Sequence, residues 1–215
     1  MPIPDISPAP RKRGRPARGT PPSRDVVLGA ALAHFSLTGF DGTGLRDIAA
    51  TAGVDAALIS HTFGSKLDLW KAVVDEIANR LAEAQKDIIR LHDASAPTEQ
   101  RVREGLSCFI ATNCKIPELA KFLSDEMSQP GARQDYVMLR IWQPYQAAML
   151  PLLHDAKADG LLGEGSPELT LRMLMGAIML PLMMIRRSGD LPLGEMSRLK
   201  DRLVKTVLPM FLEAT

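Results

Sequence analysis

Three neighbouring side chains that can form hydrogen bonds, Ser60, His61 and Thr62, end a short and otherwise apolar stretch. Hydroxyl and imidazole groups on one helix can read the donor and acceptor pattern of base edges in the major groove of DNA. The alanines before them offer apolar contact to a thymine methyl group. The residues predicted to face a DNA groove are Ala56, Ala57, Ser60, His61 and Thr62.

A tight turn and an apolar seam are needed to present such a helix. Gly53 can adopt the positive φ that the turn requires, and Asp55 is a short acceptor placed to cap the following helix. Small apolar residues supply the seam on which two helices cross: Ile48, Ala49, Ala52, Val54, Ile59 and Phe63. The pattern predicts a helix-turn-helix over residues 44–63, and hence a protein that binds double-stranded DNA.

Helices are also predicted on both sides of this motif. A first helix over residues 24–38 should be ended by Gly39, and Thr43 is the predicted N-cap of the second helix. Ser65 should cap a long helix that runs to about residue 92. Its inward stripe is predicted to be Leu69, Val73, Ile77, Leu81 and Ile88. We therefore expect a DNA-binding domain over residues 23–70.

The order of these residues resembles the amino-terminal domain of the tetracycline-repressor (TetR) family of transcriptional regulators. About fifty residues are involved in the resemblance. The matching positions are Val27, Ala30, Ala31, Phe35, Gly39, Thr43, Ile48, Ala49, Ala52, Gly53, Val54, Ile59, Phe63, Ser65 and Lys66. The sequence departs from the family pattern at Ser60, where Tyr is usual, at Thr62, where His is common, and at His34, where Leu is common.

The resemblance implies further DNA contacts at Thr43, Arg46 and Lys66. Arg46, near the start of the second helix, would reach a base edge or a phosphate. Lys66, at the start of the long helix, would contact a phosphate, helped by the amide groups of that helix end. Two alternatives remain. The three helices could be packed for stability alone, and His61 could be a solvated histidine that contacts no DNA.

A basic, proline-rich arm precedes the motif. Residues 1–24 hold six basic side chains and one acidic side chain, a balance of +5, whereas the whole chain carries +1. Residues 1–22 hold seven of the sixteen prolines, and we expect a disordered arm there. The segment from Arg13 to Pro16 resembles an AT-hook, so Arg13, Arg15 and Arg18 are predicted to contact DNA. The alternative is an arm that only touches phosphates.

Beyond residue 70 the apolar pattern stays helical, so the predicted fold is all-α, with a second domain over residues 71–215. Helices are expected from about residues 97, 117, 133, 166 and 195, and Pro144 and Pro151 should kink or split the one over residues 133–158. A ligand site is predicted among the middle helices, because apolar residues with a few polar ones line small-molecule pockets. Its candidate residues are Phe109, Asn113, Met127, Tyr136, Trp142, Gln143, Tyr145 and Met149.

The methionine-rich stretch over residues 171–185 has two interpretations, a subunit interface or the lining of an adaptable pocket. The resemblance implies that the last two long helices pair with their copies in a dimer. The predicted interface residues are Met175, Met179, Leu199, Leu203 and Val207. Because no cluster of charge accompanies the candidate pocket, we expect a largely apolar or neutral ligand.

Other classes of function find little support. Cys108 and Cys114 are six residues apart and do not share a helix face, and the four histidines are scattered, so no metal or cofactor site is predicted. No catalytic motif is found. The first residues lack the apolar core of a signal peptide, and the longest uncharged apolar run, residues 173–185, is short for a bilayer, so we expect a cytoplasmic protein with no membrane partner.

Together these features predict a homodimeric transcriptional repressor that a small molecule releases from its operator. One alternative is a ligand-independent or architectural DNA-binding protein. A second is an enzyme or carrier with a vestigial helix-turn-helix.

Overall fold

The computed structural model describes residues 23–93, 95–116, 118–188 and 196–212, and these residues form helices with no strand. In chain order the helices are α1 (Arg24–Gly42), α2 (Leu45–Ala52), α3 (Ala56–Phe63), α4 (Lys66–Arg90), α5 (Thr98–Lys115), α6 (Leu119–Met127), α7 (Ala132–Val137), the π-turn η1 (Met138–Trp142), α8 (Gln143–Ala158), α9 (Pro167–Ser188), α10 (Met196–Val207) and the 3₁₀ turn η3 (Leu208–Met210). The predicted all-α fold is confirmed for this part of the chain.

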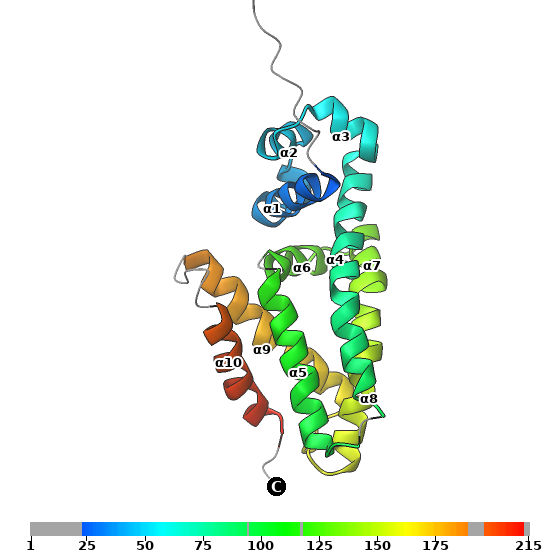
Figure 1. Cartoon of the computed structure of the whole chain (residues 1–215), viewed down its shortest axis with the longest axis vertical. Helices are drawn as coiled ribbons and strands as arrows, with labels where there is room; N and C mark the ends of the chain where they lie inside the picture. Colours follow the sequence, from blue (N-terminus) through cyan, green and yellow to red (C-terminus); the bar gives the residue numbers. More distant parts are fainter. Residues whose placement is uncertain (1–22, 94, 117, 189–195, 213–215) are drawn as a thin grey trace, which may run out of the picture.

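The first three helices form a compact group at one end of the molecule, and α4 runs from that group along the remaining helices (Figure 1). α1 packs against α2, α4 and α6. The apolar core of this end therefore includes α6 residues as well, with Leu119 and Phe122 buried beside Phe35 and Trp70. The core of the DNA-binding end thus continues past residue 70 into α6.

Local sequence explains where the first helices end. Gly39 has φ 72° and ψ 176°, which breaks the helical backbone inside α1 as predicted. Gly53 has φ 69°, the left-handed conformation that closes α2. Asp55 caps α3 by accepting from the Ala57 amide at 2.8 Å. Ser65 and Asp68 form a reciprocal capping box at the start of α4.

The predicted stripe of α4 is buried along its whole length, with Leu69, Val73 and Ile77 each at most 1% exposed. α4 packs on α5, α8 and η1, which places its second half among the helices of the second core. Residues of this helix therefore belong to both apolar cores.

The segment predicted as one helix over residues 133–158 is interrupted near Pro144 by the π-turn η1, although the backbone stays right-handed helical at both of its junctions. Pro144 follows this turn directly after Gln143, and Pro151 lies inside α8. Immediately before Pro144 the chain makes the π-turn η1. Such turns often occur at functional sites because the extra residue redirects side chains. The predicted start of the preceding helix at Pro117 lies outside the described residues.

Candidate DNA-binding surface and ligand cavity

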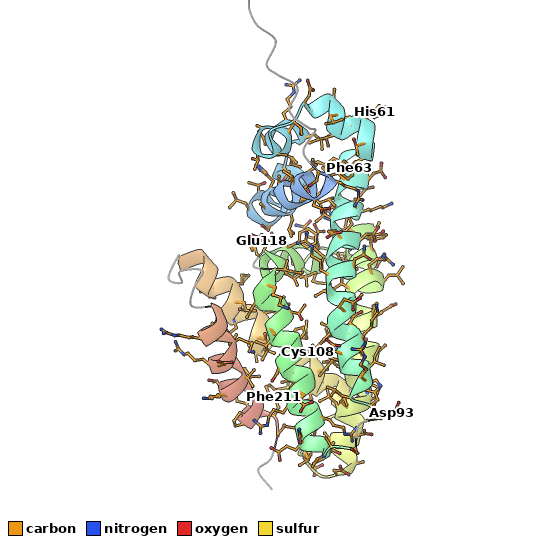
Figure 2. The ribbon with its side chains drawn as sticks, in the orientation of Figure 1. His61, Phe63, Asp93, Cys108, Glu118 and Phe211 are labelled. Atoms are coloured by element: carbon orange, nitrogen blue, oxygen red, sulfur yellow. The ribbon has the colours of Figure 1, made fainter. Side chains whose placement is uncertain are left out.

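Most of the predicted reading face of α3 is exposed. Ala57, Ser60, His61 and Thr62 are exposed, and Ile59 anchors the opposite face at 1% exposure. Figure 2 shows His61 at the outer end of the molecule, away from the second group of helices. Ala56 differs from the prediction, because it is half-buried and packs against the core.

Two polar side-chain contacts link α1 to α2 and α3. The guanidinium of Arg24 lies 5.5 Å from the centre of the Phe63 ring, joining the start of α1 to the end of α3. The ring nitrogen Nε2 of His34 lies 2.8 Å from Oγ1 of Thr51, joining α1 to α2. His34, where the sequence departs from the family pattern, thus forms a polar contact between two helices. The sequence did not predict this contact.

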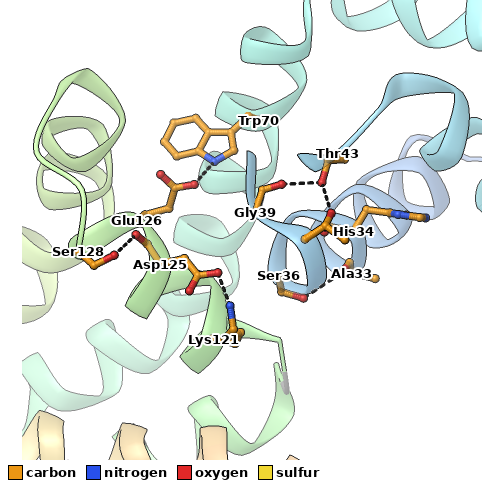
Figure 3. Close-up of polar contacts among 11 residues, drawn as sticks. Ala33, His34, Ser36, Gly39, Thr43, Trp70, Lys121, Asp125, Glu126 and Ser128 are labelled. Atoms are coloured by element: carbon orange, nitrogen blue, oxygen red, sulfur yellow. Dashed lines mark hydrogen bonds and ion pairs between the residues drawn. The ribbon is translucent and has the colours of Figure 1, made fainter. Parts of the chain in front are cut away.

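Arg46 and Thr43 have different outcomes. Arg46 is exposed on α2 and forms no hydrogen bond or ion pair with any described residue, so its guanidinium is available to DNA. Thr43 is only 3% exposed, and its hydroxyl donates to the Gly39 carbonyl at 2.7 Å (Figure 3). The N-cap of α2 is Gly44, so the prediction for Thr43 is wrong. Its side chain closes the kink of α1 and does not face a DNA groove.

Lys66 is engaged inside the protein. Its ammonium donates to the carbonyls of Phe40, at 2.9 Å, and of Thr43, at 3.0 Å. It also lies 4.5 Å from the centre of the Phe40 ring. Two of its three donors therefore join the start of α4 to the segment between α1 and α2, and its contact with a phosphate stays a prediction. The arm residues Arg13, Arg15 and Arg18 lie outside the described residues.

Helices from α4 to α9 surround a partly open cavity of about 460 Å³. Residues of α4, α5, α6, α7, η1, α8 and α9 line it. Five predicted ligand residues are among them: Phe109, Asn113, Met127, Trp142 and Tyr145. The π-turn contributes Met138, Ile141 and Trp142. The volume falls within the range of about 300–1,000 Å³ that is typical of small-molecule sites.

Three predicted ligand residues lie elsewhere. The Tyr136 hydroxyl donates to Asp75 at 3.0 Å, and burial together with this carboxylate raises the pKa of Tyr136. Gln143 is exposed at the start of α8. Met149 is fully buried between α8 and α5, where its sulfur faces Gly105. None of these three side chains is among the residues that line the cavity.

Few polar groups face the cavity. Tyr145 is 7% exposed, and its hydroxyl has no hydrogen-bond partner among the described residues. Burial, followed by the nearby Cys108, raises the pKa of Tyr145 well above its ordinary value, so the phenol is neutral. Asn113 is 4% exposed and uses one amide hydrogen for the Phe109 carbonyl at 2.9 Å. An occupant of the cavity could accept a hydrogen bond from Tyr145.

Helix α9 has three distinct faces, since successive residues are rotated by about 100°. Leu171, Leu174 and Ile178 are buried in the core. The adjoining face lines the cavity through Arg172, Met175, Gly176 and Met179. The outer face exposes Leu169, Met173 and Leu180, each more than half exposed. The predicted interface residues Met175 and Met179 therefore belong to the cavity, and the exposed apolar stripe is a different one.

The predicted interface residues of α10 are also placed differently. Leu199, Leu203 and Val207 are between 4% and 8% exposed. They lie in the same core as α5 and α8, because α10 packs along α5. Their amphipathic spacing was recognised, but the surface that buries them is part of their own chain.

A buried carboxylate joins the two ends of the molecule. Glu126 of α6 accepts from the indole nitrogen of Trp70 at 3.0 Å, as Figure 3 shows, and pairs with Arg133 at 2.9 Å. The Arg133 guanidinium lies 4.4 Å from the centre of the Phe40 ring, which is the ring that Lys66 also contacts. We call Trp70, Glu126, Arg133 and Phe40 the junction cluster.

The described residues contain no group of three or more His, Cys, Asp or Glu side chains that could hold a metal ion. Cys108 and Cys114 are free thiols, and burial raises the pKa of both. The span Pro167–Met184 of α9 is long and apolar enough to cross a bilayer by composition alone. A third of this span is buried inside the fold, and one such helix is weak evidence for a membrane span.

Residues 27–73 match the family described as bacterial regulatory proteins, tetR family. The chain is 31% identical over 141 residues to the HTH-type transcriptional dual regulator CecR of Shigella flexneri. The aligned stretch covers 61% of this chain and 63% of CecR. The chain therefore matches less than two thirds of that relative's length.

Solved structures extend the likeness to the whole fold. The hemolysin II transcriptional regulator HlyIIR superposes with a TM-score of 0.63 at 20% identity, covering 88% of this chain and 97% of HlyIIR. FadR of Bacillus subtilis, in complex with stearoyl-CoA, superposes with a TM-score of 0.65 at 14% identity, covering 86% of this chain and 98% of FadR. Residues 27–73 therefore form a helix-turn-helix domain of the tetR family of bacterial regulatory proteins, and the helical body has the fold of these solved structures.

Proposed function

We propose that this protein is a DNA-binding transcriptional repressor that releases its operator when a small molecule enters the cavity. The observation that most supports the proposal is that α4 and α6 belong both to the DNA-binding end and to the cavity wall. The named relative is a transcriptional regulator, and FadR was solved with a bound acyl-CoA, which agrees with this pairing of functions.

The DNA contacts in this proposal come from α2 and α3. Ser60, His61 and Thr62 supply hydrogen bonds to bases, and Arg46 supplies the cation that reaches a base edge or a phosphate. Because α3 carries no side chain that can form the bidentate arginine–guanine or asparagine–adenine pair, much of the selectivity must come from elsewhere. Arg13 and Arg15 of the arm, placed in the minor groove, would provide it.

Release would pass through α6. Leu119, Leu123 and Met127 of α6 line the cavity, and Glu126 of the junction cluster lies beside them on the same helix. An occupant that shifts α6 therefore changes the contacts of Trp70 and moves the start of α4 relative to α1. A coupling of about 1–3 kcal/mol would lower operator affinity by roughly 5- to 150-fold.

The proposal also includes a homodimer, because two recognition helices are needed to read half-sites about 34 Å apart. The exposed stripe of α9, with Leu169, Met173 and Leu180, is the surface best suited to bind its copy. Operator binding would place the protein in the cytoplasm.

The decisive experiment for DNA binding is Arg46→Ala, with Arg103→Ala as the matched control. Arg103 is an exposed arginine of α5 that pairs with Glu99 and is far from α3 in the chain. Arg46→Ala should weaken operator binding by about tenfold and reduce the slope of log affinity against log salt by about one contact if Arg46 binds a phosphate. Fluorescence anisotropy with labelled operator measures both quantities. Equal affinities for the two variants across salt concentrations would place the DNA surface elsewhere.

Removal of residues 1–20 tests the arm. The shortened protein should bind more weakly and should also lose an A·T preference beside each half-site, because a narrow A·T-rich minor groove attracts arginine. Selection from a randomised operator library measures that preference. A weaker protein with an unchanged flanking preference would reduce the arm to an electrostatic attachment.

The ligand-independent alternative has less support, because a cavity of about 460 Å³ with an unpartnered tyrosine hydroxyl has no structural need to exist. The ligand-independent alternative would be supported if no compound in a broad thermal-shift screen raised the melting temperature of the protein.

A further inference from the structure

Among the described residues that line the cavity, Arg172 is the one with a positive charge, and none is Asp or Glu. The remaining lining is apolar apart from neutral groups such as those of Tyr145, Asn113 and Thr112. A ligand with a positive charge would meet an arginine and no counter-charge. A ligand with one negative charge would meet a complementary partner and no repulsion.

No described residue neutralises Arg172. It forms no ion pair or hydrogen bond with any described residue, although an acidic residue, Glu168, lies one turn before it on α9. Glu168 instead lies 3.4 Å from the ring of His154 on α8. Arg172 is an exposed residue that also lines the cavity, as do Met175, Gly176 and Met179 on the same helix. An unpaired, planar donor therefore borders an apolar chamber.

From this arrangement we infer that the ligand is an anionic amphiphile, whose carboxylate or similar head binds Arg172 while its apolar body fills the cavity. The inference rests on the proposed ligand function and replaces the expectation of a neutral ligand. Guanidinium and carboxylate groups form two parallel hydrogen bonds, which fixes the orientation of the head. The flexible side chains of Met175, Met179 and Met138 would adapt to the body.

The test compares three amphiphiles of equal chain length: decanoate, decanol and decylammonium. Isothermal titration calorimetry on the full-length protein gives each dissociation constant, with all probes kept below their micelle concentrations. Decanoate should bind about tenfold more tightly than decanol, since a charge-assisted hydrogen bond is strong but this one is partly exposed to solvent. Decylammonium should bind most weakly.

Two variants identify the residue. In Arg172→Gln the ratio of the decanol and decanoate dissociation constants should fall toward one, and Arg172→Lys should restore part of it because the charge returns without the planar fork. Arg80→Gln is the matched control, since Arg80 is an arginine on a cavity-lining helix that pairs with Glu76 and does not line the cavity. It should keep the ratio of the parent protein.

Failure of this inference can be told from failure of the proposed function. Equal binding of decanoate and decanol, preference for decylammonium, no binding of any probe, or an unchanged ratio in Arg172→Gln would each overturn the anionic amphiphile. Operator anisotropy is measured in parallel. Decanoate that binds through Arg172 without releasing the operator would leave the inference standing and contradict the proposed control of DNA binding.

Discussion

Arg101 shows how a single side chain can hold several segments of this fold together. Its guanidinium donates to the carbonyls of Leu91 and His92, to Thr98 and to a carboxylate oxygen of Asp155 at 2.9 Å. The side chain is 11% exposed. It thus satisfies carbonyls after the end of α4 and ties them to α5 and α8, where helix ends otherwise leave acceptors unpaired.

Arg101→Met should lower the free energy of unfolding by about 2–3 kcal/mol, because it removes several charge-assisted hydrogen bonds and leaves partly buried carbonyls without a donor. The control is Arg103→Met, two residues away on the same helix. Arg103 pairs with Glu99 on the surface with both side chains about half exposed, so its loss should cost about 0–1 kcal/mol. Urea denaturation measures both values. Similar values would show that Arg101 is not a structural clamp.

At the scale of helices, the surroundings of two glycines show how tightly α5, α8 and α9 are packed. A β-carbon on Gly176 of α9 would meet no atom within 4 Å, because this residue faces the cavity. A β-carbon on Gly105 of α5 would lie 3.0 Å from a methyl carbon of Leu152, which is fully buried in α8. The first site has room for a side chain, and the second does not.

The substitutions Gly176→Ala and Gly105→Ala should therefore change stability with opposite signs. Gly176→Ala should raise the free energy of unfolding by about 0.5–1 kcal/mol through helix propensity. Gly105→Ala should lower it by about 1–3 kcal/mol, because an added carbon in a packed core forces its neighbours apart. Thermal and urea unfolding of the two variants decide the matter. Destabilisation of similar size in both would mean that the α9 face is packed rather than open.

The sequence predicts those features of the helices that depend on neighbours along the chain. The caps Asp55 and Ser65, the turn at Gly53 and the buried stripe of α4 follow from local residue types and helical spacing. Contacts across the fold do not follow from such patterns. Lys66 binds carbonyls 26 and 23 residues earlier in the chain, and a match at its position to the family pattern indicates nothing about that role.

The same limit explains the errors in the candidate site. Helical periodicity shows that α10 has an apolar face, but it cannot say whether α5 or a second copy covers it. For α9 it identifies apolar positions all around the helix, and only the arrangement of its neighbours separates core, cavity and exposed stripe. The sequence pattern does not predict the π-turn either, although Pro144 and Pro151 correctly indicate an interrupted helix.

For the whole molecule, the exposed stripe of α9 determines how two copies could associate. Leu180 is 57% exposed and Leu169 53% exposed, whereas Leu203 of α10 is 8% exposed. Burial of leucine-sized side chains is worth about 1.5–3 kcal/mol each, so a stripe of this kind favours association.

Leu180→Glu should convert the proposed dimer to a folded monomer, because a carboxylate would have to be desolvated at the interface. Leu203→Glu should instead unfold the protein, since the same charge would enter its own core. Sedimentation velocity reports association, and circular dichroism reports the fold. A Leu180→Glu protein that remains dimeric would place the interface on another surface.

The two tryptophans of the chain lie at the two ends of the proposed ligand response. Trp70 is fully buried and donates a hydrogen bond to Glu126, whereas Trp142 is half-buried in the cavity wall. The protein therefore contains its own optical reporters. Acrylamide should quench the emission of Trp142 but barely that of Trp70, and a bound ligand should shield Trp142. In a Trp142→Phe protein, any ligand-dependent change in emission would come from Trp70 alone and would record, without an added label, the arrival of the signal at the junction cluster.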